Sequence, residues 1–240
     1  MAQIFRQWTN SIGTVGTAAV LLGGTLATFV VWYWFAPAHT DVGYAPVQPV
    51  PYSHKLHAGE MQMDCRYCHH AVEKSAHAGV PSTQVCMNCH RHVRKDSALL
   101  KPLRDSWDNN TPVGWKRIHK VPDYAFFNHS AHVQVGVGEN RAAIGCVTCH
   151  GRIDEMVTVE QKQPLSMGWC LDCHDDPAPN LRPVDKVTDM LWRADDAWRV
   201  KSVSIAETLN PAGNRSKARK WREDGTLETR ATASCNGCHR

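Results

Sequence analysis

The residues of this chain that could do chemistry fall in one short pattern, which occurs five times. Each copy has two cysteines three positions apart and a histidine directly after the second cysteine. All ten cysteines belong to these copies: Cys65 and Cys68, Cys86 and Cys89, Cys146 and Cys149, Cys170 and Cys173, and Cys235 and Cys238. The histidines that follow them are His69, His90, His150, His174 and His239. C-x-x-C-H is the attachment signature of c-type haem, so the sequence predicts five covalently bound haems c, with these histidines as proximal iron ligands.

Three other uses of paired cysteines fit this pattern less well. Disulfide bonding gives no reason for a histidine after every second cysteine. A zinc site combines a C-x-x-C element with a second pair of ligands in a tetrahedral set, which an odd number of identical units does not provide. A thioredoxin-like redox motif would occur once, within a βαβ pattern that is not seen here. We therefore favour haem attachment.

An apolar segment precedes the haem motifs. Residues 12–35 contain no charged side chain, and a helix of this length can cross a bilayer at about 1.5 Å per residue. Aromatic residues cluster at its carboxyl end, as at a membrane interface. Ala19, Gly23 and Ala27 share one helix face, where small side chains would let a partner helix approach. A cleaved signal peptide is the alternative, but the stretch is longer than a usual signal core, so we expect residues 1–36 to form an uncleaved membrane anchor helix.

The anchor is followed by a proline-rich stretch and then by the haem motifs. The prolines of residues 37–51 predict an extended, semi-rigid linker. Residues 52–240 would form the pentahaem cytochrome c domain. Fewer than 190 residues for five motifs cannot bury each porphyrin conventionally, so we expect a mostly α-helical and irregular fold with the haems as its core. Because c-type haem is attached outside the cytoplasm, we expect this domain on the periplasmic face of the cytoplasmic (inner) membrane.

The basic charge balance does not indicate nucleic-acid binding. The formal net charge is +4, and the propionates of five haems would bring the assembled protein near neutrality or slightly below it. The densest basic segment, residues 215–222, is better explained as a solvated or partner-facing surface. We expect no nucleic-acid partner.

An internal repeat organises the remaining histidines. Each unit is an aromatic residue followed by His-x-x-His, and it precedes a pair of haem motifs. The two units are Tyr52, His54 and His57, and Phe127, His129 and His132. Histidines at i and i+3 share a helix face, so one short helix can direct two imidazoles toward neighbouring haems. The fifth motif stands alone.

These elements resemble those of class III (c3/c7-type) multihaem cytochromes, whose aromatic-x-His-x-x-His element supplies distal iron ligands. By that resemblance, His54 would complete the first haem and His129 the third. His70, directly after proximal His69, looks like the family's distal ligand to the following, second haem.

The second unit departs from this pattern at the residue after His150, which is Gly151. The fourth haem therefore needs another distal ligand. We favour Met156 over Met167, because Met167 lies close to Cys170 in the chain; packing roles for both methionines are the alternative. A thioether ligand raises the potential of a haem relative to two histidines, so the fourth haem would be the high-potential member.

The fifth haem has no second ligand nearby in the sequence, because no histidine or methionine occurs between Met190 and His239. Its distal ligand must be reached over a long loop. We expect His132 in this role, with His119 and His57 as the alternatives. That contact would tie the carboxyl terminus back onto the repeat.

The phrases around the third and fourth motifs resemble the pentahaem subunit family (ActA) of alternative complex III. They are IHKVPDYAFFNHSAHV, at residues 118–133, and CHGRIDEM followed by PLSMGWCLDCH, at residues 149–156 and 164–174. Together with the anchor and the five motifs, the resemblance covers nearly the whole chain. Related haem subunits occur in quinone reductase complexes of sulfate reducers, so the type of complex stays open.

The resemblance implies an electron-transfer subunit rather than a complete enzyme. In alternative complex III, a polytopic membrane subunit oxidises quinol. Electrons then pass through an iron–sulfur subunit and the haem subunits, including a monohaem cytochrome, to a periplasmic acceptor. This chain would relay single electrons on the outer face of such a complex.

Three other classes of multihaem protein fit the sequence less well. A pentahaem nitrite reductase has a lysine in place of one motif histidine, whereas all five motifs here end in histidine. A NapC-type membrane-anchored quinol dehydrogenase has a single anchor, but the histidine-led repeats argue against it. In reaction-centre cytochromes, methionine-bearing helices precede most haem motifs, which these repeats also disfavour.

Overall fold

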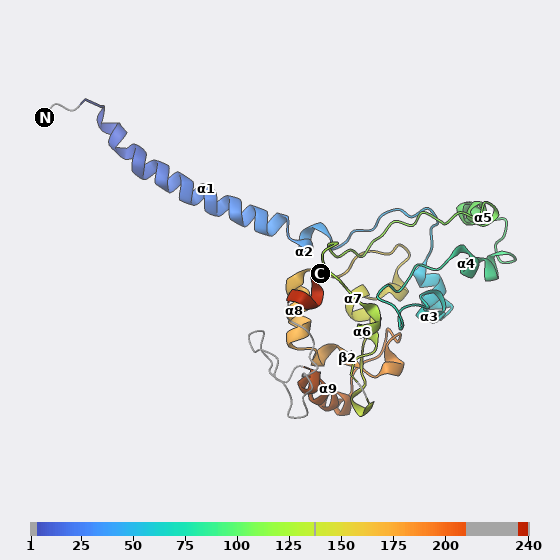
Figure 1. Cartoon of the computed structure of the whole chain (residues 1–240). Coiled ribbons are helices and arrows are strands. Elements are labelled where there is room, and N and C mark those ends of the chain that lie inside the picture. Colours follow the sequence, from blue (N-terminus) through green and yellow to red (C-terminus); the bar gives the residue numbers. More distant parts are fainter. Residues whose placement is uncertain (1–3, 137, 210–234, 240) are drawn as a thin grey trace.

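The computed structural model describes residues 4–136, 138–209 and 235–239, which form helices joined by irregular segments (Figure 1). The α-helices are α1 Ile12–Trp34, α2 Pro37–Thr40, α3 Cys65–Cys68, α4 Thr83–His90, α5 Lys101–Asp108, α6 His129–Val133, α7 Cys146–His150, α8 Met167–Asp175, α9 Asp196–Leu209 and α10 Cys235–Cys238. A π-helical turn, η2, spans Lys55–Glu60. The 3-10 turns are η1 Gln7–Ser11, η3 Ala98–Leu100, η4 Gly138–Asn140, η5 Ile153–Glu155, η6 Ala178–Asn180 and η7 Val184–Lys186. This architecture agrees with the mostly α-helical and irregular class predicted from the sequence.

Two very short strands complete the regular structure. Strand β1 (Ala143–Ile144) pairs antiparallel with β2 (Leu181–Arg182), with Ile144 opposite Leu181. Their side chains are buried. The pair joins the segment before the third haem motif to the segment after the fourth.

Helix α1 is the apolar helix expected near the amino terminus. With the preceding turn, the helical segment Gln7–Trp34 is long and apolar enough to cross a membrane. None of the residues of α1 is buried, and Figure 1 shows the helix projecting away from the other elements. An apolar helix exposed on all sides is stable in lipid or against partner helices, and much less so in water.

The proline-rich stretch after α1 differs from the extended linker that the sequence predicts. Pro37 begins the short helix α2, because the fixed φ of proline suits the first position of a helix. Farther along, the Gly43 amide donates to the Gln161 carbonyl oxygen at 2.8 Å. Val50 is buried in a cluster with Met87 of α4. This stretch therefore packs against the haem-motif region instead of spanning a gap.

Buried apolar side chains form three small clusters within the described residues. The largest joins β1, β2 and α9 and contains Ala142, Ile144, Leu181, Ile205 and Ala206. The second contains Val50, Met87 and Leu103. The third contains Val133, Ala143 and Val187. Burying a large apolar side chain contributes about 1.5–3 kcal/mol, so clusters of this size give a modest core; that the haems supply the rest stays a prediction.

Side-chain caps fix the start of three short helices that carry functional residues. The Asp64 carboxylate accepts from the Arg66 amide at 2.8 Å and starts α3. The Asn128 side chain accepts from the Ser130 amide at 3.0 Å and starts α6. The Ser166 hydroxyl accepts from the Trp169 amide at 3.3 Å at the start of α8. Each cap satisfies an amide that the first helical turn leaves without a partner.

Candidate functional site

Each of the five C-x-x-C-H motifs lies on its own short helix: α3, α4, α7, α8 and α10. We number them first to fifth along the chain. Cysteines at i and i+3 on a helix face the same side, so both sulfurs of each of the first four motifs are presented together. Each motif histidine is one of the last two residues of its helix or directly follows it. Within the described part of the chain, no group of three or more His, Cys, Asp or Glu converges on a point that would hold a single metal ion. The motifs thus stand as separate units.

Three of the motif histidines are held by backbone carbonyls through their Nδ1 atoms. His69 Nδ1 lies 2.6 Å from the Gly79 oxygen, and His90 Nδ1 lies 3.0 Å from the Val93 oxygen. His239 Nδ1 lies 3.2 Å from the carbonyl oxygen of Tyr124. A carbonyl only accepts, so Nδ1 carries the proton and the Nε2 lone pair stays free. This is the arrangement that metal-binding histidines adopt in proteins.

The first repeat unit arranges two more imidazoles around one aromatic ring. The Tyr52 ring stands edge-on to His54, with centroids 4.8 Å apart and an interplanar angle of 86°. It stacks on His57 at 4.5 Å and 24°. His57 Nδ1 lies 2.9 Å from the Ser53 carbonyl oxygen, four residues earlier. His57 is therefore oriented with its Nε2 atom free, like the motif histidines.

The second repeat unit has nearly the same geometry. The Phe127 ring stands edge-on to His129 at 4.8 Å and 88°, and stacks on His132 at 4.4 Å and 28°. His132 Nδ1 lies 2.7 Å from the Asn128 oxygen, again four residues earlier. His129 Nδ1 lies 2.8 Å from the Ala76 oxygen. The repeat seen in the sequence is thus also a repeat in three dimensions.

Three of these imidazoles lie opposite motif histidines at a common spacing. The ring centroids are 6.3 Å apart for His57 and His90, 6.5 Å for His129 and His150, and 6.1 Å for His132 and His174. Two metal–nitrogen bonds of about 2 Å, with half an imidazole ring at each end, add up to about 6 Å. The spacing therefore fits one iron between the two rings of each pair. The residues present fit c-type haem at the second, third and fourth motifs.

His54 is the equivalent of His129 in the first repeat unit. Its Nδ1 atom is buried and lacks a hydrogen-bond partner among the described residues. Burial, followed by the neighbouring His69, lowers the pKa of His54 to about 4. A neutral imidazole is the form that binds a metal. These observations place His54 near the motif histidine of the first site, consistent with the role that the sequence predicts for it.

Burial keeps the histidines of the second repeat and the third site neutral as well. It lowers the pKa of His150 to about 3, with further contributions led by His119 and His129. It also lowers the pKa of His129 and of His132. His119 lies at the third site, where its Nε2 atom is 3.3 Å from His150 Nδ1. The prediction that His119 is an alternative ligand for the fifth haem has no support from this position.

The second site departs from the sequence-based assignment of its distal ligand. The resemblance to class III cytochromes favours His70, but His70 is exposed. The ring opposite His90 is that of His57. The repeat in the sequence could have indicated His57. It is the equivalent of His132, which lies opposite the motif histidine of the fourth site.

The fourth site departs from the predicted methionine ligand for the same reason, because His132 lies opposite its motif histidine. Met156 is buried, and its Cε atom lies 3.7 Å from the point that a Cβ atom on Gly151 would occupy, so it packs beside the third site. Met167 is 67% exposed. Gly151 has φ +67°, in the region that favours glycine, which explains why a histidine does not follow His150.

The fifth site packs against the chain just before the second repeat unit. His239 forms an antiparallel bridge with Ala125, and the Phe126 amide donates to the Cys238 oxygen at 2.6 Å. The Tyr124 ring stacks on His239 at 5.6 Å. The carboxyl terminus is thus tied back beside the repeat through backbone contacts. His132, predicted as its first-choice distal ligand, is placed at the fourth site instead.

Comparison with known proteins bears on the class of protein to which the chain is similar. No family model matches the chain. Over 174 residues, the chain is 28% identical to the multihaem cytochrome c subunit of menaquinone reductase from Nitratidesulfovibrio vulgaris. The match covers 66% of this chain and 81% of that protein. This likeness, together with five C-x-x-C-H helices and imidazole pairs spaced for iron, supports a place for the chain among the multihaem cytochromes c.

Proposed function

We propose that this chain is an electron-transfer subunit of a membrane quinol:acceptor oxidoreductase of the alternative complex III type. It carries five covalently bound haems c and relays electrons toward a periplasmic acceptor. The observation that carries this proposal is the set of three imidazole pairs with centroids 6.1, 6.3 and 6.5 Å apart, each including a motif histidine. At these three sites, two imidazoles would hold one iron between them, which suits electron transfer.

The residues that would hold each haem follow from the motifs and the pairs. The first site would use Cys65, Cys68, His69 and His54; the second Cys86, Cys89, His90 and His57; the third Cys146, Cys149, His150 and His129; the fourth Cys170, Cys173, His174 and His132; and the fifth Cys235, Cys238 and His239. When bound, haem c supplies reversible one-electron chemistry at its iron. The chain's own contribution is to attach, orient and space these groups.

The anchor and the haem domain would lie in different environments. We place residues 1–36 in the cytoplasmic membrane, with residues 52–240 on its periplasmic face. Helix α1 supports this arrangement, since it is apolar and exposed on all sides. Quinol oxidation would take place on a polytopic membrane partner, with an iron–sulfur subunit and a monohaem cytochrome in the same complex.

Two other complexes remain as alternatives for the same kind of subunit. The relative is the multihaem subunit of a menaquinone reductase, so this chain could serve a related quinone reductase. A NapC-type chain would instead oxidise quinol by itself. The two aromatic-x-His-x-x-His repeat units disfavour the second alternative.

Purification of the native complex in mild detergent tests the proposal. We expect a polytopic membrane subunit and an iron–sulfur subunit to remain bound to this chain. The purified complex should reduce the haems when quinol is added, whereas the chain separated from its partners should stay oxidised. Reduction of the separated chain by quinol would contradict the proposal and favour the NapC-type alternative.

A further inference from the structure

Contacts between the haem motifs indicate which of them are neighbours in space. One contact joins the first and second motifs through the residues between their cysteines. The Asn88 amide donates to the Tyr67 hydroxyl at 3.2 Å. Burial raises the pKa of the Cys86 thiol, and nearby Cys68 adds to the effect. The first and second sites are therefore neighbours.

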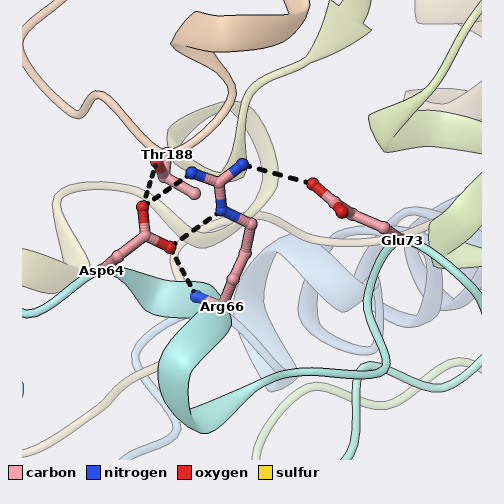
Figure 2. Close-up of polar contacts among 4 residues, drawn as sticks. All are labelled: Asp64, Arg66, Glu73 and Thr188. Carbon is pink, nitrogen blue, oxygen red and sulfur yellow. Dashed lines mark hydrogen bonds and ion pairs between the residues drawn. The ribbon is translucent and has the colours of Figure 1, made fainter.

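The first motif is also linked to the third, through the segment that contains Thr188, 124 residues after Asp64. Figure 2 shows the Asp64 carboxylate, the cap of α3, between the Arg66 side chain and the Thr188 hydroxyl. The Asp64–Thr188 contact is 3.2 Å, and the Arg66 guanidinium reaches Glu73 at 3.3 Å on its other side. This network fixes the first motif against the segment that contains Thr188.

The residue before Thr188 holds the third motif. The Cys146 amide donates to the Val187 carbonyl oxygen at 3.1 Å, so consecutive residues bind the helix starts of the first and third motifs. The first and third sites thus meet at their attachment points.

The third and fourth sites are joined by α6. One face of this helix presents His129 to His150 of the third motif and His132 to His174 of the fourth. The third and fourth sites are therefore neighbours.

The fourth and fifth sites are neighbours as well. The hydrogen bond from the Phe126 amide to the Cys238 oxygen, at 2.6 Å, holds α10 just before α6, the helix that carries His132 of the fourth site. Burial raises the pKa of the Cys170 thiol, and Cys238 of the fifth motif is the largest further contribution. The fifth motif therefore extends the series beyond the fourth.

We propose that the five attachment sites form one line in space, in the order second, first, third, fourth, fifth. The inference rests on the proposed function, because it assigns neighbours within the same electron-transfer chain. The second and fifth sites are then the two ends of the line, where electrons enter or leave. The junction between the two repeats lies between the first and third sites, at the Asp64–Thr188 contact.

Removing single sites from the full-length, membrane-anchored protein tests this order. The double variant Cys86→Ala, Cys89→Ala removes the second site, and Cys65→Ala, Cys68→Ala removes the first. The charge at one site changes as it takes up an electron, and this acts most strongly on its nearest neighbours. In a redox titration followed by visible and EPR spectra, loss of the second site should shift the midpoint of one remaining haem. Loss of the first should shift two.

The order of the sequence predicts the reverse, with two shifts after loss of the second site and one after loss of the first. That result would overturn the proposal. Loss of the fifth site, by Cys235→Ala with Cys238→Ala, is the matched control and should shift one midpoint under either order. A control variant that shifts two midpoints would also contradict a line that ends at the fifth site.

Two further measurements separate a wrong order from a wrong function. The intact mass should show five haems in the wild type and four in each variant; a wild type with fewer would refute the proposed function instead. If a cysteine variant does not accumulate, His90→Met and His69→Met keep the haem attached and raise its potential. His90→Met should then shift the midpoint of one other haem, and His69→Met should shift the midpoints of two. The reverse result would again overturn the order.

Discussion

An imidazole that is to bind iron through Nε2 needs its other nitrogen held by an acceptor, and the Nδ1–carbonyl bond provides this. Three histidines of the repeat units have such a bond: His57 at 2.9 Å, His129 at 2.8 Å and His132 at 2.7 Å. The bond fixes the tautomer and the orientation of the ring before a metal is present. His70, in contrast, is exposed.

Alanine variants of His57 and His70 test which residue serves the second site. We expect His57→Ala to convert one haem into a five-coordinate, high-spin form that binds carbon monoxide, because its iron loses one of two imidazoles. His70→Ala is the matched control and should bind no more carbon monoxide than the wild type. The measurement is the visible and EPR spectrum with and without carbon monoxide. A reactive haem in His70→Ala, and none in His57→Ala, would restore the assignment made by resemblance.

The methionines are tested in the same way. Met156 is buried beside the third site, so Met156→Leu keeps the packing at a cost of less than about 1.5 kcal/mol and should leave every midpoint unchanged. His132→Met should raise the midpoint of one haem, because a thioether replaces an imidazole at the fourth site. A midpoint that falls in Met156→Leu would show that Met156 binds iron after all. Redox titration decides between the two results.

At the scale of elements, the shortest helices depend on their caps. Helix α3 is a single turn, and its Asp64 cap also binds Arg66 and Thr188 (Figure 2). Asp64→Ala should lower the free energy of unfolding by about 1 kcal/mol, whereas Asp64→Asn retains the cap and should lose less. The Arg66 hydrogen bond lowers the pKa of Asp64 to about 2. Its contribution is therefore complete above about pH 4 and is lost as the pH falls toward 2.

Thermal unfolding of the haem-loaded protein, followed by circular dichroism, checks this prediction. At neutral pH, the unfolding temperature of Asp64→Asn should be closer to that of the wild type than the unfolding temperature of Asp64→Ala is. The difference between wild type and Asp64→Ala should shrink as the pH is lowered from 5 to 2. A difference that stays constant over this range would contradict a role for the ionised carboxylate.

The elements that the sequence predicted well are those with a strong local pattern. The apolar run from residue 12 to residue 35 predicted α1, which spans Ile12–Trp34, and the spacing of the histidines predicted the repeat. The sequence does not predict the helical turn that begins at Pro37, because a high density of prolines favours an extended chain. Strands of two residues, β1 and β2, are too short to show alternation.

For the candidate site, the sequence predicts the cysteines and histidines of the five C-x-x-C-H motifs. The motif histidines and the involvement of both His-x-x-His units follow from spacing. The partner of each histidine does not, because it depends on contacts between segments far apart in the chain. His132 is an example. From the sequence we expect it to be the distal ligand of the fifth haem, but in the fold its ring lies opposite His174 of the fourth site.

At the scale of the whole molecule, two features leave surfaces that other components must cover. Helix α1 exposes an apolar surface on all sides, which a membrane or partner helices would cover. The apolar clusters of the remaining described residues are small, and bound haems would fill the space between the motif helices. The line of attachment sites would then run through the domain as both its core and its electron path.

Whether all five motifs carry a covalent haem can be measured as the intact mass of the denatured chain. Denaturation removes every group held only by ligation, whereas thioether bonds to the ten cysteines survive. We predict that the full-length polypeptide is heavier than its sequence by the mass of five haems. An increment of four haems or fewer in the native, fully matured protein would contradict covalent attachment at all five motifs.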